Sequence, residues 1–115
     1  MASVSKREIL TSTALTDSYT TPAVSVDLLD CEFLAVLTAS AIHADTTLDA
    51  KLQHSPDGGT NWEDLVSFTQ VTDTSAFEVK DITSKILPTV RAVVTLAGST
   101  TEATVAIDLF NDRKK

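Results

Sequence analysis

The chain of 115 residues is poor in cysteine, glycine, proline and aromatic residues. It has one cysteine, three glycines and three prolines, and aromatic residues make up 5% of it. A single cysteine, Cys31, excludes an internal disulfide and is consistent with assembly in a reducing cytosol. Asp30 and Glu32 flank it and disfavour the thiolate, so we expect an inert thiol and not a nucleophile.

Basic residues are scarce between the two ends of the chain. There are 16 acidic and nine basic residues, which give a net charge of −7. Five of the nine basic residues lie at the ends: Lys6, Arg7, Arg113, Lys114 and Lys115. The part between them holds four basic and all 16 acidic residues, or −12. Such a body repels nucleic acid and anionic membranes, so neither is an expected partner.

Long hydrophobic runs are also missing. No stretch approaches the ~18 consecutive apolar residues of a transmembrane helix. The first eight residues contain no apolar segment of the kind found in signal peptides. The sequence therefore predicts a soluble protein that is made in the cytoplasm without export.

The two histidines do not form a recognisable metal or catalytic motif. His43 precedes Asp45 by two residues, which would place both on one face of a strand, and His54 precedes Asp57 by three. Zinc sites need three or four ligands at characteristic spacings, and neither an HExxH motif nor paired cysteines are present. Both histidines are therefore predicted to lie at the surface or in turns.

Other chemical signatures are equally absent. The 11 serines include no GxSxG elbow, and three glycines are too few for a phosphate-binding loop. Acid pairs such as Glu63 with Asp64, or Asp45 with Asp49, offer Ca²⁺ as an alternative, but scattered acids are more typical of solvated strand faces and turns. The sequence predicts a protein that is not an enzyme and has no cofactor or metal.

What the chain does contain is the pattern of β-strands. It has 18 threonines, and apolar residues make up 43%. Apolar and polar residues alternate over 24–28 and 48–54, as in half-buried strands, and 90–96 and 103–110 are two further predicted strands. The nearly continuous apolar run 33–42 predicts a central strand buried on both faces, with a short helix as the alternative. We expect the strands over 90–96 and 103–110 to pair with each other.

The remaining segments complete an all-β pattern. Phe77 and Val79 mark a short strand, and 82–88 could form one helical or 3₁₀ turn closed by Pro88. About seven or eight short strands with frequent turns fit an antiparallel β-sandwich of immunoglobulin-like or jelly-roll-like type. We expect one such domain over residues 1–115, with an N-terminal arm (1–8) and a basic C-terminal tail (111–115).

The strongest local signal is the turn between 48–54 and 62–71. Its sequence is Ser55-Pro56-Asp57-Gly58-Gly59-Thr60-Asn61-Trp62. Asp-Gly-Gly tolerates positive φ, so this segment predicts a β-hairpin. The alternation after the turn shifts near 64–66, which predicts a bulge there. The turn resembles the Asp box (SxDxGxTW) of sialidase-like propellers, except that Asn61 replaces the usual threonine. A single copy cannot form a propeller, so the motif predicts a structural turn, with a glycan-binding module as an alternative.

Residues 24–109 also resemble small all-β structural proteins of tailed bacteriophages. In that group a strand ending in Leu-Gln-x-Ser leads into Asp-Gly and Trp, and an Arg-Ala-Val strand follows. The corresponding segments here are LDAKLQHSPDGGTNWEDL (48–65), FTQVT (68–72) and VRAVVTLAG (90–98). An aromatic residue that is usual just before the Arg strand is replaced by Pro88-Thr89.

This resemblance implies a virion protein, foremost a capsid decoration or cement protein. A head-spike base and a neck or tail component are the alternatives within the same group. The implied partners are the major capsid protein or other virion proteins, and further copies of the chain, with a trimer as the expected oligomer.

Three sets of residues follow as candidates. The expected core and turn residues are Leu52, Asp57, Gly58, Trp62, Phe68, Val93 and Leu96. Arg91, inside an apolar strand, is expected to have a carboxylate partner or to reach solvent. The expected partner contacts are Ser3, Val4, Lys6, Arg7, Arg113, Lys114 and Lys115.

Overall fold

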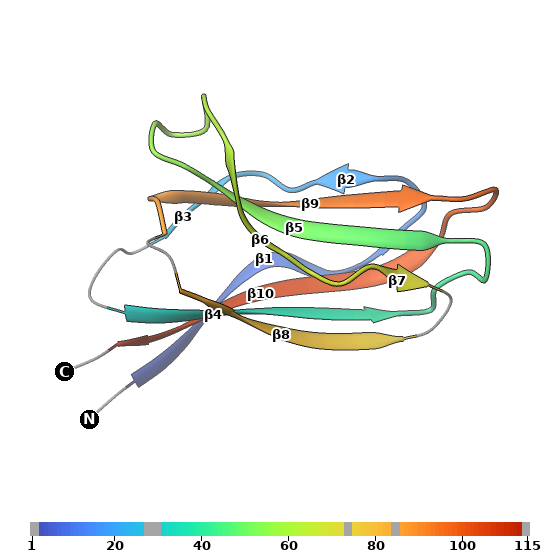
Figure 1. The fold of residues 1–115 in the computed structure, drawn as a ribbon, viewed down its shortest axis with the longest axis horizontal. Coiled ribbons are helices and arrows are strands. Elements are labelled where there is room, and N and C mark those ends of the chain that lie inside the picture. Colours follow the sequence, from blue (N-terminus) through green and yellow to red (C-terminus); the bar gives the residue numbers. More distant parts are fainter. Residues whose placement is uncertain (1–2, 27–30, 73–74, 84–85, 114–115) are drawn as a thin grey trace.

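The computed structural model describes residues 3–26, 31–72, 75–83 and 86–113, and the side chains of all of these except 3–5, 31–32 and 111–113. Within these residues there are ten strands and no helix (Figure 1). The strands are β1 (Ser3–Leu15), β2 (Tyr19–Thr20), β3 (Val24–Ser25), β4 (Cys31–Ser40), β5 (Thr47–Ser55), β6 (Glu63–Ser67), β7 (Val71–Thr72), β8 (Ala76–Ile82), β9 (Thr89–Ala97) and β10 (Ala103–Arg113). Nothing in the described part of the chain is a helix long and apolar enough to cross a membrane.

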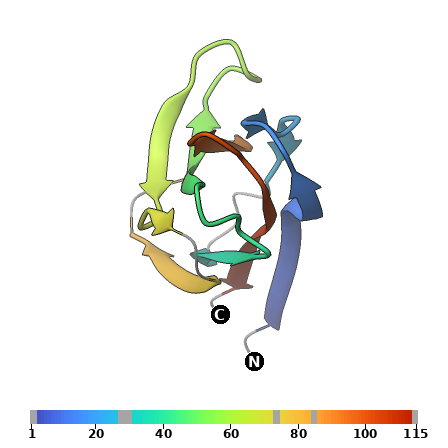
Figure 2. The same cartoon turned by 90° about the vertical axis from the view of Figure 1, so that its right-hand side faces the viewer.

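The strands form two antiparallel sheets that pack face to face (Figures 1 and 2). Sheet A has the order β1-β10-β4-β8. Sheet B has the order β2-β9-β5-β6, with β3 also paired to β9 and β7 to β5. The predicted all-β sandwich is therefore confirmed.

Alternation along the long strands builds the core between the sheets. Successive side chains point to opposite faces of a strand, so every second residue of β5, β9 and β10 is buried. Leu52, Phe68 and Leu96 are buried as predicted. Val93 lies on the outer face of sheet B and is half-buried, because its neighbours Ala92 and Val94 occupy the inner face.

One face assignment made from the sequence is wrong, and one strand has apolar residues on its exposed face. β4 is buried on its inner face only: Leu37 is fully buried, but Leu34 is 39% exposed, since no described segment covers the outer face of sheet A. On β8 the side chains of Phe77 and Val79 point outward, with 71% and 48% of their surface exposed. The inner face of this edge strand instead carries Glu78 and Lys80, which reach solvent at the rim of the sandwich.

The last two long strands do not pair with each other, contrary to expectation. β9 pairs with β5 in sheet B, and β10 pairs with β1 and β4 in sheet A. Residues 98–102 therefore cross from one sheet to the other. Gly98 begins this crossover with φ +134°, a conformation that only glycine adopts readily.

The hairpin predicted at the Asp-box turn is confirmed. β5 and β6 pair antiparallel from Lys51↔Ser67 to His54↔Glu63. Leu52 pairs with Val66 but Gln53 pairs with Asp64, so one extra residue bulges at the predicted position. No described residue of 82–88 forms the expected helical turn, and residues 84–85 lie outside the described part of the chain.

The two ends of the chain are strands and not loose arms over most of their predicted length. β1 pairs with β10 from Ser3↔Arg113 to Leu15↔Ala103. The expected arm and tail therefore support each other through backbone hydrogen bonds, while Lys114 and Lys115 lie outside the described residues.

Candidate functional site

The Asp-box turn is held by side chains that bond its own backbone. The Ser55 hydroxyl is fully buried and donates to Asp57 Oδ1 (2.7 Å), and its oxygen accepts from Gly59 N–H (3.0 Å). Asp57 Oδ1 also accepts from the N–H groups of Thr60 (3.1 Å) and Asn61 (2.9 Å). The Asn61 side chain donates to Asp57 Oδ2 (2.6 Å). Asn61, which stands where the Asp box usually has threonine, thus bonds the turn aspartate with its side chain.

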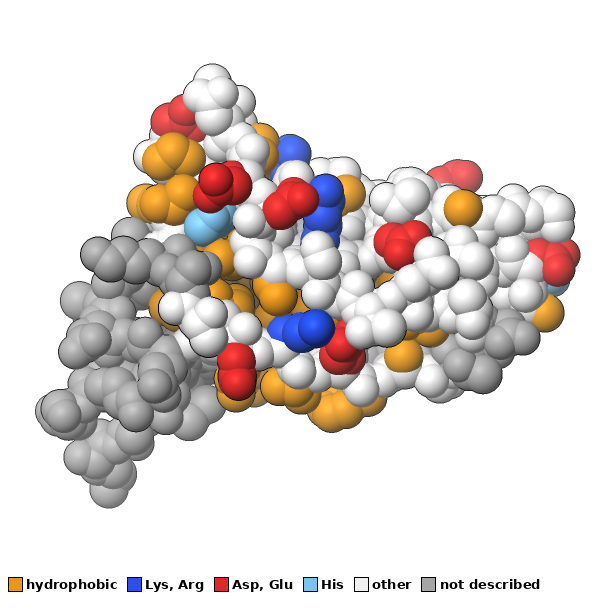
Figure 3. Space-filling model, viewed as in Figure 1, with side chains coloured by type: hydrophobic (Ala, Val, Ile, Leu, Met, Phe, Trp, Pro, Cys, Tyr) orange, Lys and Arg blue, Asp and Glu red, His pale blue; other side chains and the backbone are white. Residues whose placement is uncertain are grey.

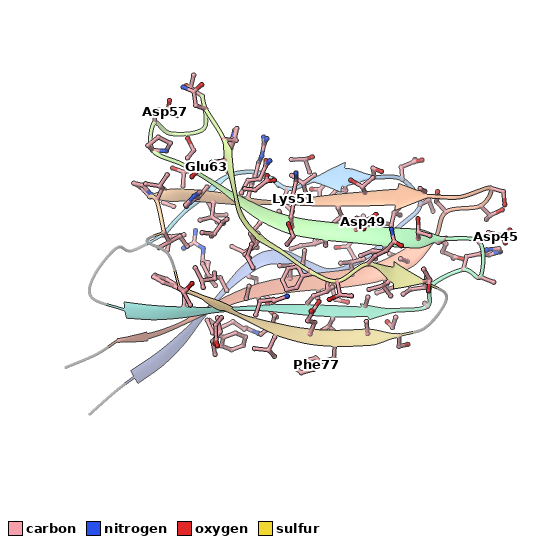
Figure 4. The ribbon with its side chains drawn as sticks, viewed as in Figure 1. Asp45, Asp49, Lys51, Asp57, Glu63 and Phe77 are labelled. Atoms are coloured by element: carbon pink, nitrogen blue, oxygen red, sulfur yellow. The ribbon has the colours of Figure 1, made fainter. Side chains whose placement is uncertain are left out.

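These donors stabilise the ionised form of Asp57. The Asn61 N–H, the Ser55 hydroxyl and the Asn61 amide together lower the pKa of Asp57 far below its ordinary value. Gly58 lies at the tip with φ +77° and open space around it. The turn is therefore a rigid, negatively charged projection from sheet B, where Figure 4 labels Asp57.

Asp57→Asn is expected to lower the free energy of unfolding at neutral pH. The amide nitrogen that replaces Oδ2 cannot accept the hydrogen bond from the Asn61 side chain. Asp57 has a lowered pKa in the folded protein, so its ionised form stabilises the fold above the ordinary pKa of 3.8, and this contribution declines as the pH falls below that value. Denaturant unfolding of both proteins at several pH values measures the difference, which should narrow between about pH 5 and pH 2. A difference that is constant over this range contradicts the role given to Asp57.

Trp62 is half-buried and both its edge and its face are occupied. Its Nε1–H donates to Gly59 O (3.0 Å), and a Cβ on Gly59 would lie 3.3 Å from the indole ring. The guanidinium of Arg91 lies over the ring, with its Cζ 4.1 Å from the ring centroid. Trp62 therefore anchors the turn to β9 by a cation–π contact.

Arg91 reaches the outer face of sheet B and is half-exposed, which is the second of its two expected alternatives, and its side-chain partner is an amide and not a carboxylate. Its Nε–H donates to the Gln53 side-chain oxygen (2.9 Å), and the Gln53 amide donates to Asp64 Oδ1 (3.0 Å). Lys51 Nζ lies 3.1 Å from the same carboxylate. The bonds from Gln53 and then Lys51 lower the pKa of Asp64. A polar row thus runs over the outer face of sheet B from Trp62 to Lys51, because β9, β5 and β6 are neighbours there.

Arg91→Ala is expected to shift the emission maximum of Trp62, which is the single tryptophan of the chain, to longer wavelength. Removal of the guanidinium exposes one face of the indole to water, at a cost of about 1 kcal/mol in the free energy of unfolding. Fluorescence of the folded protein measures the shift. Lys51→Ala is the matched control, because it removes a charged side chain from the same polar row and leaves the Arg91–Trp62 contact in place. An unchanged spectrum for Arg91→Ala contradicts the stacking.

A shallow cavity of about 210 Å³ continues this outer face of sheet B. Its lining residues are Asp49, Ala50, Lys51, Ser67, Phe68, Val93 and Thr95. Asp49 already accepts two hydrogen bonds from the Gln70 amide, and Lys51 is paired with Asp64. Among the described residues no three metal-ligating side chains come together. Both charged side chains that line the cavity therefore already have partners.

The prediction that both histidines lie at the surface or in turns is wrong for His54. This side chain is buried, with 4% of its residue surface exposed, because β5 places it under the segment that precedes β9. Its Nδ1 accepts from Leu87 N–H (3.1 Å), so the proton is on Nε2, which faces Glu63 Oε1 at 3.3 Å. His43 lies in a turn, and its Nδ1 accepts from Asp45 N–H (3.1 Å). His43 and Asp45 are therefore turn residues and do not share the strand face that their spacing predicted.

The described candidate contact residues at the ends lie on the paired strands β1 and β10 of sheet A. Lys6 and Arg7 are exposed on β1, and Lys6 Nζ lies 3.9 Å from Glu8 Oε2. Ser3, Val4 and Arg113 belong to the paired ends of β1 and β10, but their side chains, like that of Cys31, are outside the described set. Beside them, partial burial raises the pKa of Asp108, with Lys6 opposing and Glu8 adding to the shift.

Several structural hydroxyls escaped the sequence reasoning. Ser18 Oγ and Thr21 Oγ1 accept the N–H groups of Leu96 and Ala92 (both 2.9 Å), extending the hydrogen bonding of β9 where β2 ends. Buried Thr46 donates to Thr100 O (2.8 Å) and accepts from Glu102 N–H (3.0 Å). In a sequence with 18 threonines, nothing distinguishes these from solvent-facing ones.

No protein-family model and no curated protein matches the chain. Solved structures match it at low identity. In the crystal structure of the infectious bursal disease virus VP2 subviral particle, the match has a TM-score of 0.66 and 11% identity, and it covers 97% of this chain and 33% of the VP2 chain. In T=1 particles derived from infectious bursal virus, the TM-score is 0.61 with 10% identity, and the coverage is 97% and 32%. The chain spans about a third of the length of these proteins and shares the fold of that part.

Proposed function

We propose that this protein is a non-enzymatic structural component of a virus particle. The observation that carries the proposal is the match of 97% of the chain to part of VP2, a protein whose solved structures are of assembled particles. The site geometry agrees with it: the polar row of sheet B is satisfied internally, and the described residues offer no metal cluster. A fold alone does not determine a function, so the assignment also rests on surface properties.

Within this class we propose a decoration or cement protein on the capsid exterior of a tailed bacteriophage. The body of the chain is strongly acidic, and acidic side chains are scattered over the face seen in Figure 3. Dispersed negative charge keeps a particle soluble and suits an outward-facing surface. The partners are the major capsid protein, or another virion protein, and further copies of this chain, with many weak contacts acting together.

The glycan-binding alternative has less support from the geometry. A carbohydrate-binding tryptophan presents a free ring face to a sugar, but Arg91 covers Trp62 and Gly59 packs against it. Asp57 and Ser55 direct their hydrogen bonds to the turn. A glycan array with the wild-type protein should therefore give no specific binding.

Reconstitution on particles tests the proposal. Purified protein, added to particles that lack it, should cosediment with them and saturate at a fixed number of copies per particle, whereas protein unfolded beforehand should not. Immunogold labelling of intact virions should mark the whole shell. Labelling at one site per particle would assign the protein to the neck or tail instead. Absence from virions together with failure to bind particles would refute a virion role.

A further inference from the structure

The edge strand β8 has one side without a partner. All seven of its residues pair with β4, from Phe33↔Ile82 to Ala39↔Ala76, and no described strand pairs with the opposite edge. Phe77 and Val79 are the two most exposed large apolar side chains among those described. Phe77 points away from the sheet in Figure 4, and apolar side chains line the lower rim in Figure 3, where β8 lies. Unpaired backbone groups beside exposed apolar residues form a ready site for strand addition.

We infer that β8 pairs antiparallel with β8 of a second copy of this chain, across a two-fold axis at Val79. In this register Val79 lies opposite Val79 of the second copy, and Ala76 lies opposite Ile82. Glu78 lies opposite Lys80 on one side of the axis, and Lys80 opposite Glu78 on the other. Directly opposed residues in antiparallel strands share one face, so these pairs are in contact. Phe77 lies opposite Asp81 and diagonally next to Val79.

Charge selects this register over its neighbours. Shifting the axis by one residue toward the N-terminus places Glu78 opposite Glu78, and shifting it toward the C-terminus places Lys80 opposite Lys80. Like charges directly opposite each other destabilise a strand pair, and opposite charges stabilise it. The register centred on Val79 pairs all seven residues of β8 and places no like charges directly opposite each other.

The charges are already held in place for this contact. Glu78 accepts hydrogen bonds from the N–H and the hydroxyl of Thr69, each at 2.8 Å, and lies 3.7 Å from Lys80 Nζ. Partial burial would raise the pKa of Glu78, but the bonds from Thr69 and the charge of Lys80 outweigh it and lower the pKa, so the carboxylate is ionised at neutral pH. A Lys80 from the second copy therefore meets a fixed, charged partner.

The pairing joins two copies of sheet A into one continuous eight-stranded sheet. Such a contact is isologous and closes at two copies, in place of the trimer expected from the sequence. It does not depend on the proposed virion role. A single strand edge gives a small interface, so the dimer should dissociate on dilution.

Sedimentation equilibrium of the full chain over a range of concentrations tests the inference. The wild type should reach twice the mass of the chain. Lys80→Glu and Glu78→Lys should each remain monomeric where the wild type is dimeric, because each places like charges across the axis. A mixture of the two variants should regain the dimer, since the first carries acidic side chains at both positions and the second carries basic ones. Circular dichroism confirms that each variant is folded.

Lys6→Glu is the matched control, because it reverses an exposed charge on β1, the opposite edge of sheet A. It should leave the dimer intact. In a Cys31→Ser background, Val79→Cys should form an interchain disulfide on mild oxidation, since opposed Cα atoms in antiparallel strands are close enough for one. A wild type that stays monomeric at all concentrations, a trimer, or a mixture of charge variants that fails to associate would overturn the inference.

Discussion

Gly98→Ala is expected to destabilise the protein more than any other single methyl addition at a described glycine. A Cβ on Gly98 would overlap Asp45 O and lie 2.9 Å from Asp45 C. Both are backbone atoms, so no side-chain rotation relieves the clash. The φ of +134° adds strain for any residue with a Cβ. We expect the free energy of unfolding to fall by about 4 kcal/mol or more, measured by urea denaturation.

Gly58→Ala provides the control for this prediction. Gly58 also has a positive φ, +77°, but a Cβ there meets nothing within 4 Å. The cost should be about 1 kcal/mol, from backbone strain alone. Equal losses in the free energy of unfolding for the two substitutions would contradict the close backbone contact between Gly98 and Asp45.

His54→Ala is expected to lower the free energy of unfolding by about 3 kcal/mol. The substitution leaves a cavity under the segment before β9 and removes the acceptor of the Leu87 N–H, which His54 Nδ1 bonds at 3.1 Å. Because the side chain is almost completely buried, water cannot replace the lost bond at full strength. Urea denaturation at pH 7 measures the loss.

Two further variants separate the contributions of His54. His54→Asn keeps an acceptor near the position of Nδ1 and should recover part of the stability. Glu63 is the partner of His54 Nε2, and its side chain is 79% exposed. Glu63→Gln should therefore change the free energy of unfolding little. A large loss in Glu63→Gln with a small one in His54→Ala would mean that the surface contact, and not the buried Leu87 bond, is what matters.

The sequence predicts the individual strands well where a local pattern determines them. The apolar residues of 48–54 and 90–96 identify β5 and β9 as strands. The buried faces are predicted less completely, because His54 lies on the inner face of β5 and Val93 on the outer face of β9. The Asp-box turn predicts the hairpin, because Ser55 and Asp57 bond atoms close to them in the sequence, and the shift of the alternation near 64–66 predicts its bulge. These features need no information from distant parts of the chain.

The pairing of strands and the burial of polar residues were harder to predict. An alternating strand shows that one face is buried but not against which sheet, so β9 and β10 could equally have paired with each other. The crossover between them is bonded by Thr46 and Asp45, which lie 54 residues before their partners and give no local signal. On β8 Phe77 and Val79 face outward while Glu78 and Lys80 face inward, because an edge strand lets Glu78 meet Thr69. The partner of Arg91 was missed because Gln53 lies on a neighbouring strand.

The position of β10 has a consequence for how the protein folds as it is synthesised. β10 lies between β1 and β4, so the first and fourth strands of the chain cannot join until the last long strand has left the ribosome. Sheet B lacks this constraint, because β2, β5, β6 and β9 all precede residue 98. We therefore expect nascent chains to form sheet B first, with an uncovered apolar face that needs a chaperone until sheet A closes over it in a late, all-or-none step.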